Sequence, residues 1–215
     1  MTQTKRRWLL VGWLCLQPCW SMVSIPTAQA SVLVRLSLAD MTTRAGHVFQ
    51  GRVEKLTSRF VPGHDGLIIT EVQIRCLRSL RGVRQGEVLL VSHLGGVVGE
   101  KGQRVFGEAS YQVGEEVVVL AEKRENRLYA VGMAQGKIHV DRTTGSSLVQ
   151  VHIDGAELID PTGKPTKPAA LGIPLETLWA ELSTLVQRHP SPSVWEERTT
   201  PNKVRQDLEK SGRRP

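Results

Sequence analysis

The run from Leu67 to Leu80 constrains this chain of 215 residues more than any other feature of its sequence. Glu71, Gln73 and Arg75 alternate there with apolar residues. A period of two puts successive side chains on opposite faces of an extended strand, so one face is wet and the other is buried. The run therefore predicts a strand at the surface of a sheet that covers a core on one side.

Other short strands are predicted before and after this run, separated by turn signals such as Gly63-His64-Asp65-Gly66 and Glu125-Asn126. They cover residues 47–59, 87–93, 117–123, 128–132, 138–140 and 148–153. A short helix is predicted in front of them, because Ser37 can cap its first turn and Asp40, three residues later, can complete a capping box with it. It is expected to end at Ala45-Gly46, where glycine permits a left-handed turn. Strands at this spacing are typical of a small antiparallel barrel.

Residues 95–114 contain six glycines, and the segment shows neither the hydrophobic periodicity of a helix nor that of a strand. We interpret them as a long connection with a small hairpin around Gln103–Phe106. Long loops on a rigid sheet commonly carry binding, so Gln103, Arg104 and Phe106 are the candidate partner-binding residues. The alternative is that the glycines only allow the chain to cross the end of the barrel.

Residues 1–30 have the three parts of a secretory signal peptide. A cationic start, Lys5-Arg6-Arg7, precedes the apolar run Trp8–Leu16, and Ala28-Gln29-Ala30 supplies the small residues that a signal peptidase recognises. We expect cleavage after Ala30 and export to the periplasm or the extracellular space. The alternatives are an uncleaved leader, which would be the chain's one membrane contact, and a lipid-modified Cys19.

Removal of the leader leaves Cys76 as the sole cysteine, so an internal disulfide is excluded and a packed core must stabilise the fold. Cys76 continues the alternation of Thr70, Val72 and Ile74, and we expect it to be buried as a small hydrophobe.

The composition changes after Asp160, and the prediction is a barrel domain over 31–160, a linker over 161–173, a helix over 174–189 and a disordered tail over 190–215. The predicted helix carries one apolar stripe, which contains Leu175, Leu178, Leu182, Leu185 and Val186. The stripe is expected to pack on the barrel, and a partner protein is the alternative.

The formal charge of +7 belongs to the two ends of the chain, because residues 31–160 have a net charge of only +1. Because positive and negative charges nearly cancel there, the electrostatic attraction for phosphate groups is weak, and nucleic acid is not an expected partner. The six histidines show no metal-ligand spacing, and no cofactor motif is present. Glu115 and Glu116 are interpreted as a turn exit and a solvated side chain, because adjacent strand residues face opposite ways.

Several of these segments together resemble a family of exported bacterial proteins of uncharacterised function with an OB-like barrel. The resemblance rests on the Ser37-Leu38-Ala39-Asp40 helix, the strand from His47, Leu80-Arg81-Gly82, Val113-Gly114-Glu115-Glu116 and Gly132–Lys137, and it covers residues 37–140. A more distant similarity is to the netrin-like barrels, which include metalloproteinase inhibitors. Those inhibitors use an amino-terminal cysteine and several disulfides, which this chain lacks once its leader is removed, so their mechanism does not carry over.

The sequence thus predicts a mainly β fold, a small antiparallel OB-like β-barrel with a short N-terminal helix and a C-terminal helix. The expected function is that of an exported, non-catalytic binding or structural module of the cell envelope, with no cofactor and no metal. Its expected partner is an envelope or extracellular protein. The alternatives are a protease-inhibitor-like module and a hydrolase whose site is assembled across strands.

Overall fold

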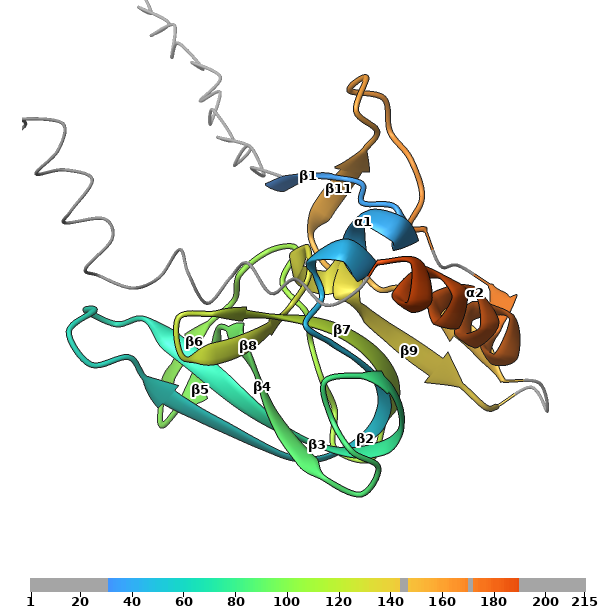
Figure 1. Cartoon of the computed structure of the whole chain (residues 1–215). Coiled ribbons are helices and arrows are strands. Elements are labelled where there is room, and N and C mark those ends of the chain that lie inside the picture. Colours follow the sequence, from blue (N-terminus) through green and yellow to red (C-terminus); the bar gives the residue numbers. More distant parts are fainter. Residues whose placement is uncertain (1–30, 144–146, 170–171, 190–215) are drawn as a thin grey trace, which may run out of the picture.

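The computed structural model describes residues 31–143, 147–169 and 172–189 (Figure 1). The predicted leader and the predicted tail lie outside these ranges. In the described part of the chain, no helix has the length and apolar character needed to cross a membrane.

Five strands of the main sheet close into a ring, as predicted from the strand spacing. They are β2 (His47–Phe60), β3 (Ile68–Arg81), β4 (Val88–Leu94), β7 (Glu116–Arg124) and β8 (Arg127–Ala130). Around the ring β2 pairs with β3, β3 with β4, β4 with β8, β8 with β7, and β7 with β2. The pairing of β4 with β8 is parallel, so this OB-like barrel is antiparallel at four of its five seams.

Further strands extend the main sheet beyond β7: β9 (Lys137–Asp141), β10 (Leu148–Gln150) and β12 (Ile173–Pro174). A 3-10 turn, η1 (Met133–Gly136), leads into β9. A separate parallel pair, which was not predicted, joins β1 (Ser31–Val34) to β11 (Ala156–Ile159).

The strand β2 bends where it passes from one neighbour to the other. Its first half pairs with both β3 and β7, whereas its second half pairs with β3 alone. The register with β3 shifts between Gln50 and Gly51 and again between Val53 and Lys55, as at β-bulges. A side chain at Gly51 would come within 2.6 Å of Ile74, so the missing Cβ permits this close crossing.

The sheet separates two apolar cores. The barrel interior is filled by side chains such as Phe49, Val72, Ile74, Val117 and Val119. The second core lies between the outer face of the sheet and the two helices, α1 (Leu38–Arg44) and α2 (Leu175–Arg188). Cys76 is 1% exposed and belongs to the barrel interior, as its alternation predicted.

The helix α1 begins as predicted. The Ser37 hydroxyl accepts a hydrogen bond from the Asp40 N–H (3.0 Å), and the Asp40 carboxylate accepts one from the Ser37 N–H (3.2 Å). The Asp40 carboxylate also accepts a hydrogen bond from the Ser37 hydroxyl (2.6 Å), and this bond, together with the one from the Ser37 N–H, lowers the pKa of Asp40. The expected left-handed glycine at the end of α1 was wrong: Ala45 is the C-cap in an extended conformation, and Gly46 does not have a positive φ.

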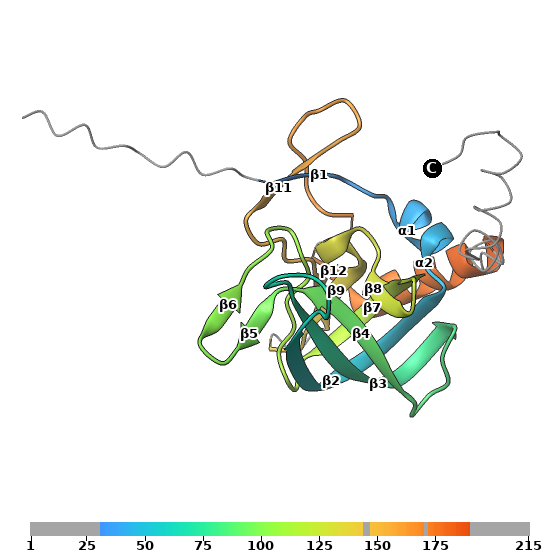
Figure 2. The same cartoon turned by 90° about the vertical axis from the view of Figure 1, so that its left-hand side faces the viewer.

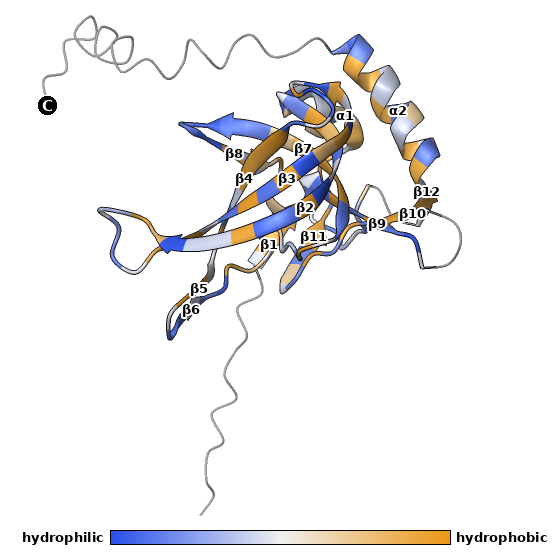
Figure 3. Cartoon of the chain, turned by 90° about the horizontal axis from the view of Figure 1, so that it is seen from below, coloured by the Kyte–Doolittle hydropathy of each residue, from blue (hydrophilic) through white to orange (hydrophobic). Residues whose placement is uncertain are grey.

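The helix α2 lies against the sheet, so its apolar stripe packs on the barrel rather than being left for a partner. Leu175, Leu178 and Leu182 are buried in the second core. Figure 3 shows the alternation of hydrophobic and hydrophilic residues along α2 and along β2 and β3. Full burial of a leucine stabilises a fold by about 1.5–3 kcal/mol, so these three residues account for much of the docking of α2.

The hairpin of the glycine-rich connection lies earlier in the chain than predicted. It is formed by β5 (Gly96–Val98) and β6 (Lys101–Gln103), with its turn at Gly99-Glu100. Gly96 has a φ of +133° and lies where a Cβ would come within 2.3 Å of the Thr70 hydroxyl oxygen. The glycines therefore allow the hairpin to lie close against β2 and β3.

Candidate binding surfaces

The three predicted partner-binding residues occupy different environments on or beside the β5–β6 hairpin. Gln103 lies on β6, and its Oε1 accepts a hydrogen bond from the Ile68 N–H (2.7 Å), which ties the hairpin to β3. Arg104 is 67% exposed and lies 3.5 Å from the Asp154 carboxylate. Phe106 is 45% exposed, and its ring covers Gly155. The geometry thus gives Gln103 a positioning role and leaves Arg104 and Phe106 at the surface.

Two more exposed apolar residues lie on the same hairpin or directly beside it. Val97, on β5, is 67% exposed, and Phe60, at the end of β2, is 40% exposed. Lys101 Nζ lies 5.9 Å from the Phe60 ring centroid, and Arg104 Cζ lies 5.5 Å from that of Phe106. We call Phe60, Val97, Lys101, Arg104 and Phe106 the hairpin surface. Figures 1 and 2 place the β5–β6 hairpin and α2 at opposite ends of the molecule.

A groove of about 850 Å³ runs beside β4, on strands other than those of the hairpin. One wall is formed by residues from Glu87 to Leu90, and the other by the β7–β8 turn from Glu125 to Leu128. Arg59 and Glu71 lie in the same lining and form an ion pair of 2.7 Å. We call this hollow the β4 groove. The sequence offered no signal for it, because its two walls come from distant parts of the chain.

Ionisable side chains are buried beside Tyr111, which belongs to the core of the barrel interior. Lys137 Nζ lies 3.0 Å from Glu115 Oε1, and these side chains are only 7% and 10% exposed. Lys137 Nζ also lies 5.3 Å from the ring centroid of Tyr111. His139 Nδ1 approaches Glu115 Oε2 at 3.4 Å, and the His139 and His152 rings are 5.8 Å apart.

This interior cluster is sheltered from the surface cavities. Burial raises the pKa of the Tyr111 hydroxyl, and Glu108 and Glu115 raise it further, so Tyr111 remains a neutral phenol. Neither the β4 groove nor a second hollow of about 270 Å³ beside Glu108 and Tyr129 is lined by Lys137 or Glu115. The arrangement therefore supplies a buried ion pair that neither of these two hollows reaches.

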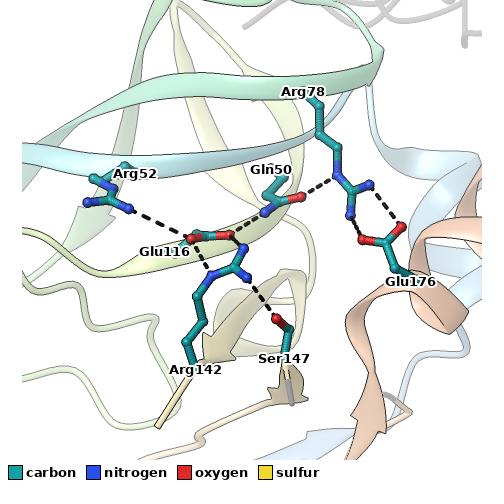
Figure 4. Close-up of polar contacts among 7 residues, drawn as sticks. All are labelled: Gln50, Arg52, Arg78, Glu116, Arg142, Ser147 and Glu176. Atoms are coloured by element: carbon teal, nitrogen blue, oxygen red, sulfur yellow. Dashed lines mark hydrogen bonds and ion pairs between the residues drawn. The ribbon is translucent and has the colours of Figure 1, made fainter. Parts of the chain in front are cut away.

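Glu115 and Glu116 face opposite ways, as predicted, but the prediction that one of them is solvated was wrong. Glu116 is 7% exposed and contacts Gln50 and Arg142, whereas Glu115 contacts Lys137 beside Tyr111 of the barrel interior. Its carboxylate accepts hydrogen bonds from Arg142 (2.6 and 2.9 Å) and from the Gln50 amide (Figure 4). Burial alone would raise the pKa of Glu116, and the bonds from Arg142 and Gln50 outweigh it, so this pKa is lowered.

The polar network around Glu116 continues to α2. The side-chain amide oxygen of Gln50 accepts a hydrogen bond from Arg78 on β3. Arg78 also donates to both carboxylate oxygens of Glu176 on α2 (2.8 and 3.0 Å) (Figure 4). The Arg78 guanidinium also lies 4.1 Å from the Trp179 ring centroid. Arg81 donates to the carbonyls of Ala45 and Val186, near the ends of α1 and α2. Arg78 and Arg81 thus connect the sheet to the two helices.

Within the described ranges, no group of three or more histidine, cysteine, aspartate or glutamate side chains is placed to hold a metal ion. The structure therefore presents two candidate surfaces, the hairpin surface and the β4 groove. No protein-family model matches this sequence, and no curated protein matches it either.

Proposed function

We propose that this chain is an exported, non-catalytic binding module of the cell envelope and that it binds a partner protein through the hairpin surface. Export rests on the leader over residues 1–30. The observation that carries the binding proposal is the group of exposed apolar side chains and cations that lie on the β5–β6 hairpin or next to it in the chain or the sheet. Aromatic residues and arginine are enriched in the cores of protein interfaces, and the hairpin surface combines both.

The anchoring of the hairpin supports its use as a binding element. The Gln103 hydrogen bond to Ile68 and the close packing of Gly96 on Thr70 fix its base on the barrel. A fixed base lowers the entropy lost when the exposed residues meet a partner. The near-neutral charge of residues 31–160 is consistent with a protein partner rather than a nucleic acid.

The proposal is tested by photo-crosslinking in the native envelope. A photoreactive amino acid replaces Val97 in one chain and Gln187 in another, since Gln187 is exposed on α2 at the opposite end of the molecule. We expect one defined protein adduct from position 97 and none from position 187. The same adduct from both positions, or none from position 97, would contradict a site on the hairpin.

A pair of matched variants measures how much Val97 contributes to binding. Val97 and Val113 are 67% and 66% exposed, so neither glutamate substitution disturbs a core. Val97→Glu is expected to weaken the affinity for the crosslinked protein by at least about fivefold, which is the effect of losing about 1 kcal/mol at a hot spot. Val113→Glu is expected to change it by less than about twofold. Equal losses for both variants would remove the hairpin from the interface.

The projecting hairpin also favours a protease-inhibitor-like module as a second candidate. Its turn, Gly99-Glu100, is exposed and lies at the tip of the two strands. The crosslinking experiment distinguishes the two roles. An inhibitor would give an adduct with a protease and would be protected from cleavage at this turn, whereas a binding module would give an adduct with another class of protein.

A further inference from the structure

One side of the first half of β4 has no neighbouring strand. β4 pairs with β3 over its whole length, from Val88 opposite Arg75 to Leu94 opposite Ile69. On its other side β4 pairs with β8 only at Val91 and Ser92. In the described part of the chain, no strand lies beside Val88–Leu90 on that side. We call this stretch the β4 edge.

The hydrogen-bond pattern shows which backbone groups of the β4 edge point outward. The Cys76 N–H donates to the Glu87 carbonyl at 2.8 Å. Hydrogen-bonded and non-hydrogen-bonded positions alternate along an antiparallel pair, so Leu89 and Val91 bond to β3 whereas Val88 and Leu90 direct their N–H and C=O groups away from it. The ring of the barrel is thus closed at Val91 and Ser92 but leaves the Val88 backbone without a strand partner.

The side chains of the β4 edge add apolar contact to this row of backbone groups. Val88 and Leu90 are 41% and 51% exposed and lie on the outer face, whereas Leu89 packs against the barrel interior. The β4 groove lies directly beside them, and its volume of about 850 Å³ is within the ~300–1,000 Å³ range of binding clefts. The groove therefore combines strand-spaced donors and acceptors with two alternating apolar side chains.

The charged residues in the β4 groove indicate which charge a bound ligand would carry. Arg59 is already paired with Glu71. Among the described residues, Glu87, Glu125 and Arg127 form no ion pair, although one Glu87 carboxylate oxygen accepts a hydrogen bond from the Arg84 N–H (2.9 Å). The groove thus holds two carboxylates and one guanidinium that are not paired with an opposite charge. A basic residue on the occupant would find a carboxylate partner at either wall of the groove.

From these observations we infer that the β4 edge binds an extended segment of another polypeptide as an added strand. The segment hydrogen-bonds to the Val88 backbone, as in β-strand addition. The side chains of the added segment alternate between its two faces. The apolar ones on the outer face pack on Val88 and Leu90, and a lysine or arginine near them pairs with Glu87 or Glu125. This second site lies on other strands than the hairpin surface and does not depend on it.

Displayed peptides test the inference on the purified chain. The probe is a library of short peptides in which valine, isoleucine and threonine alternate and a lysine or arginine stands at one end. We expect selected peptides to slow amide hydrogen exchange at Val88 and Leu90 by at least about tenfold at saturation, because these amides become hydrogen-bonded. Recovery of no binding peptide would overturn the inference, as would peptides that protect only amides outside β4.

Two substitutions of one residue separate the backbone from the side chain. Val88→Pro removes the outward N–H and leaves the β3 hydrogen bonds, which involve the neighbouring positions, intact. Val88→Thr keeps both the N–H and the β-branched shape. We expect the proline variant to lose at least about tenfold in peptide affinity and the threonine variant less than about threefold. Full binding by a folded Val88→Pro chain would exclude strand addition, and amide protection in the unsubstituted chain decides the question if that variant does not fold.

Discussion

Two histidines, His47 and His93, have a lower pKa in the folded chain than in the unfolded chain. Burial lowers the pKa of His93, which is partly offset by a hydrogen bond to the Leu94 carbonyl, and burial together with Lys123 lowers the pKa of His47. His93 Nε2 is buried without a hydrogen-bond partner among the described residues. The unfolded chain protonates both imidazoles near 6.5, the ordinary value, so below that pH it binds more protons than the folded chain. The free energy of unfolding therefore falls as the pH drops below about 6.5.

Replacing His93 by phenylalanine is expected to reduce this acid sensitivity. The ring beside Tyr111 is kept, and the titrating group is lost. Urea unfolding at pH ~7.5 and pH ~5.5 should show a smaller loss of stability in His93→Phe than in the unsubstituted chain, by up to about 1.4 kcal/mol, which is the limit set by the single pH unit between 6.5 and ~5.5. His64→Gln, in an exposed turn, serves as the control and should keep the original pH dependence. An unchanged pH dependence in His93→Phe would show that His93 does not oppose acid.

The ion pair of Glu115 and Lys137 makes a second residue-level prediction. Lys137→Met alone leaves a carboxylate in the barrel interior with its principal partner removed, and we expect it to lower the free energy of unfolding by about 3–5 kcal/mol. Glu115→Leu together with Lys137→Met replaces the pair by apolar groups, and most of the loss should be recovered. Urea unfolding of both single variants and the double variant measures the coupling. A double variant as unstable as Lys137→Met would mean that the charges themselves are not the cause.

These buried charges show where reasoning from sequence ends at the residue scale. The period of two predicted that Glu115 and Glu116 face opposite sides of the sheet, and it predicted the burial of Cys76. It did not predict the burial of both carboxylates, because their partners Lys137 and Arg142 lie 22 and 26 residues further along the chain. A charge can be buried only when such a partner reaches it, and that depends on which strands pair.

Among the elements, α2 is held by one apolar face, and its docking can be tested at the centre of that face. Leu178 is 0% exposed, so Leu178→Ala opens a cavity between α2 and the sheet and should cost about 2–5 kcal/mol. Gln187→Ala, on the exposed side of the helix, should change the stability by less than about 0.5 kcal/mol. Urea unfolding followed by far-ultraviolet circular dichroism measures both. Equal, small effects would mean that α2 is not part of the cooperative fold.

The elements that were predicted correctly are those long enough to show a period. The strands β2 and β3 and the helix α2 each have 14 residues, and their alternation or apolar stripe is visible in the sequence. β5 and β6 have three residues each, so the hairpin was displaced toward residues 103–106. β1 and β11 were not predicted, because each is four residues long and their parallel pairing joins distant segments of the chain. The hairpin surface consequently shares only Arg104 and Phe106 with the predicted candidates, and Phe60, Val97 and Lys101 were not predicted.

At the scale of the whole molecule, one wall of strands serves two cores. β2 and β7 face the barrel interior with Phe49, Val117 and Val119, and they face α1 and α2 with Val48, Val118 and Leu120. Strands buried on both faces carry continuous apolar runs, which is why residues 117–121 show no alternation. The opposite side of the ring, at β4 and β8, borders the β4 groove, and in the part of the chain that the structure describes neither α1 nor α2 covers it.

This asymmetry predicts where the barrel opens first. The seam between β4 and β8 has two residue pairs, whereas β2 has twelve with β3 and six with β7. Fewer ladder hydrogen bonds and no covering helix lower the free energy of a local opening. Native-state hydrogen exchange should therefore give Ser92 and Ala130, whose N–H groups point across the seam, opening free energies at least about 1.4 kcal/mol below that of Leu120 on β7, which corresponds to tenfold faster exchange. Equal values at all three positions would mean that the ring opens only by global unfolding and that the short seam is as strong as the shared wall.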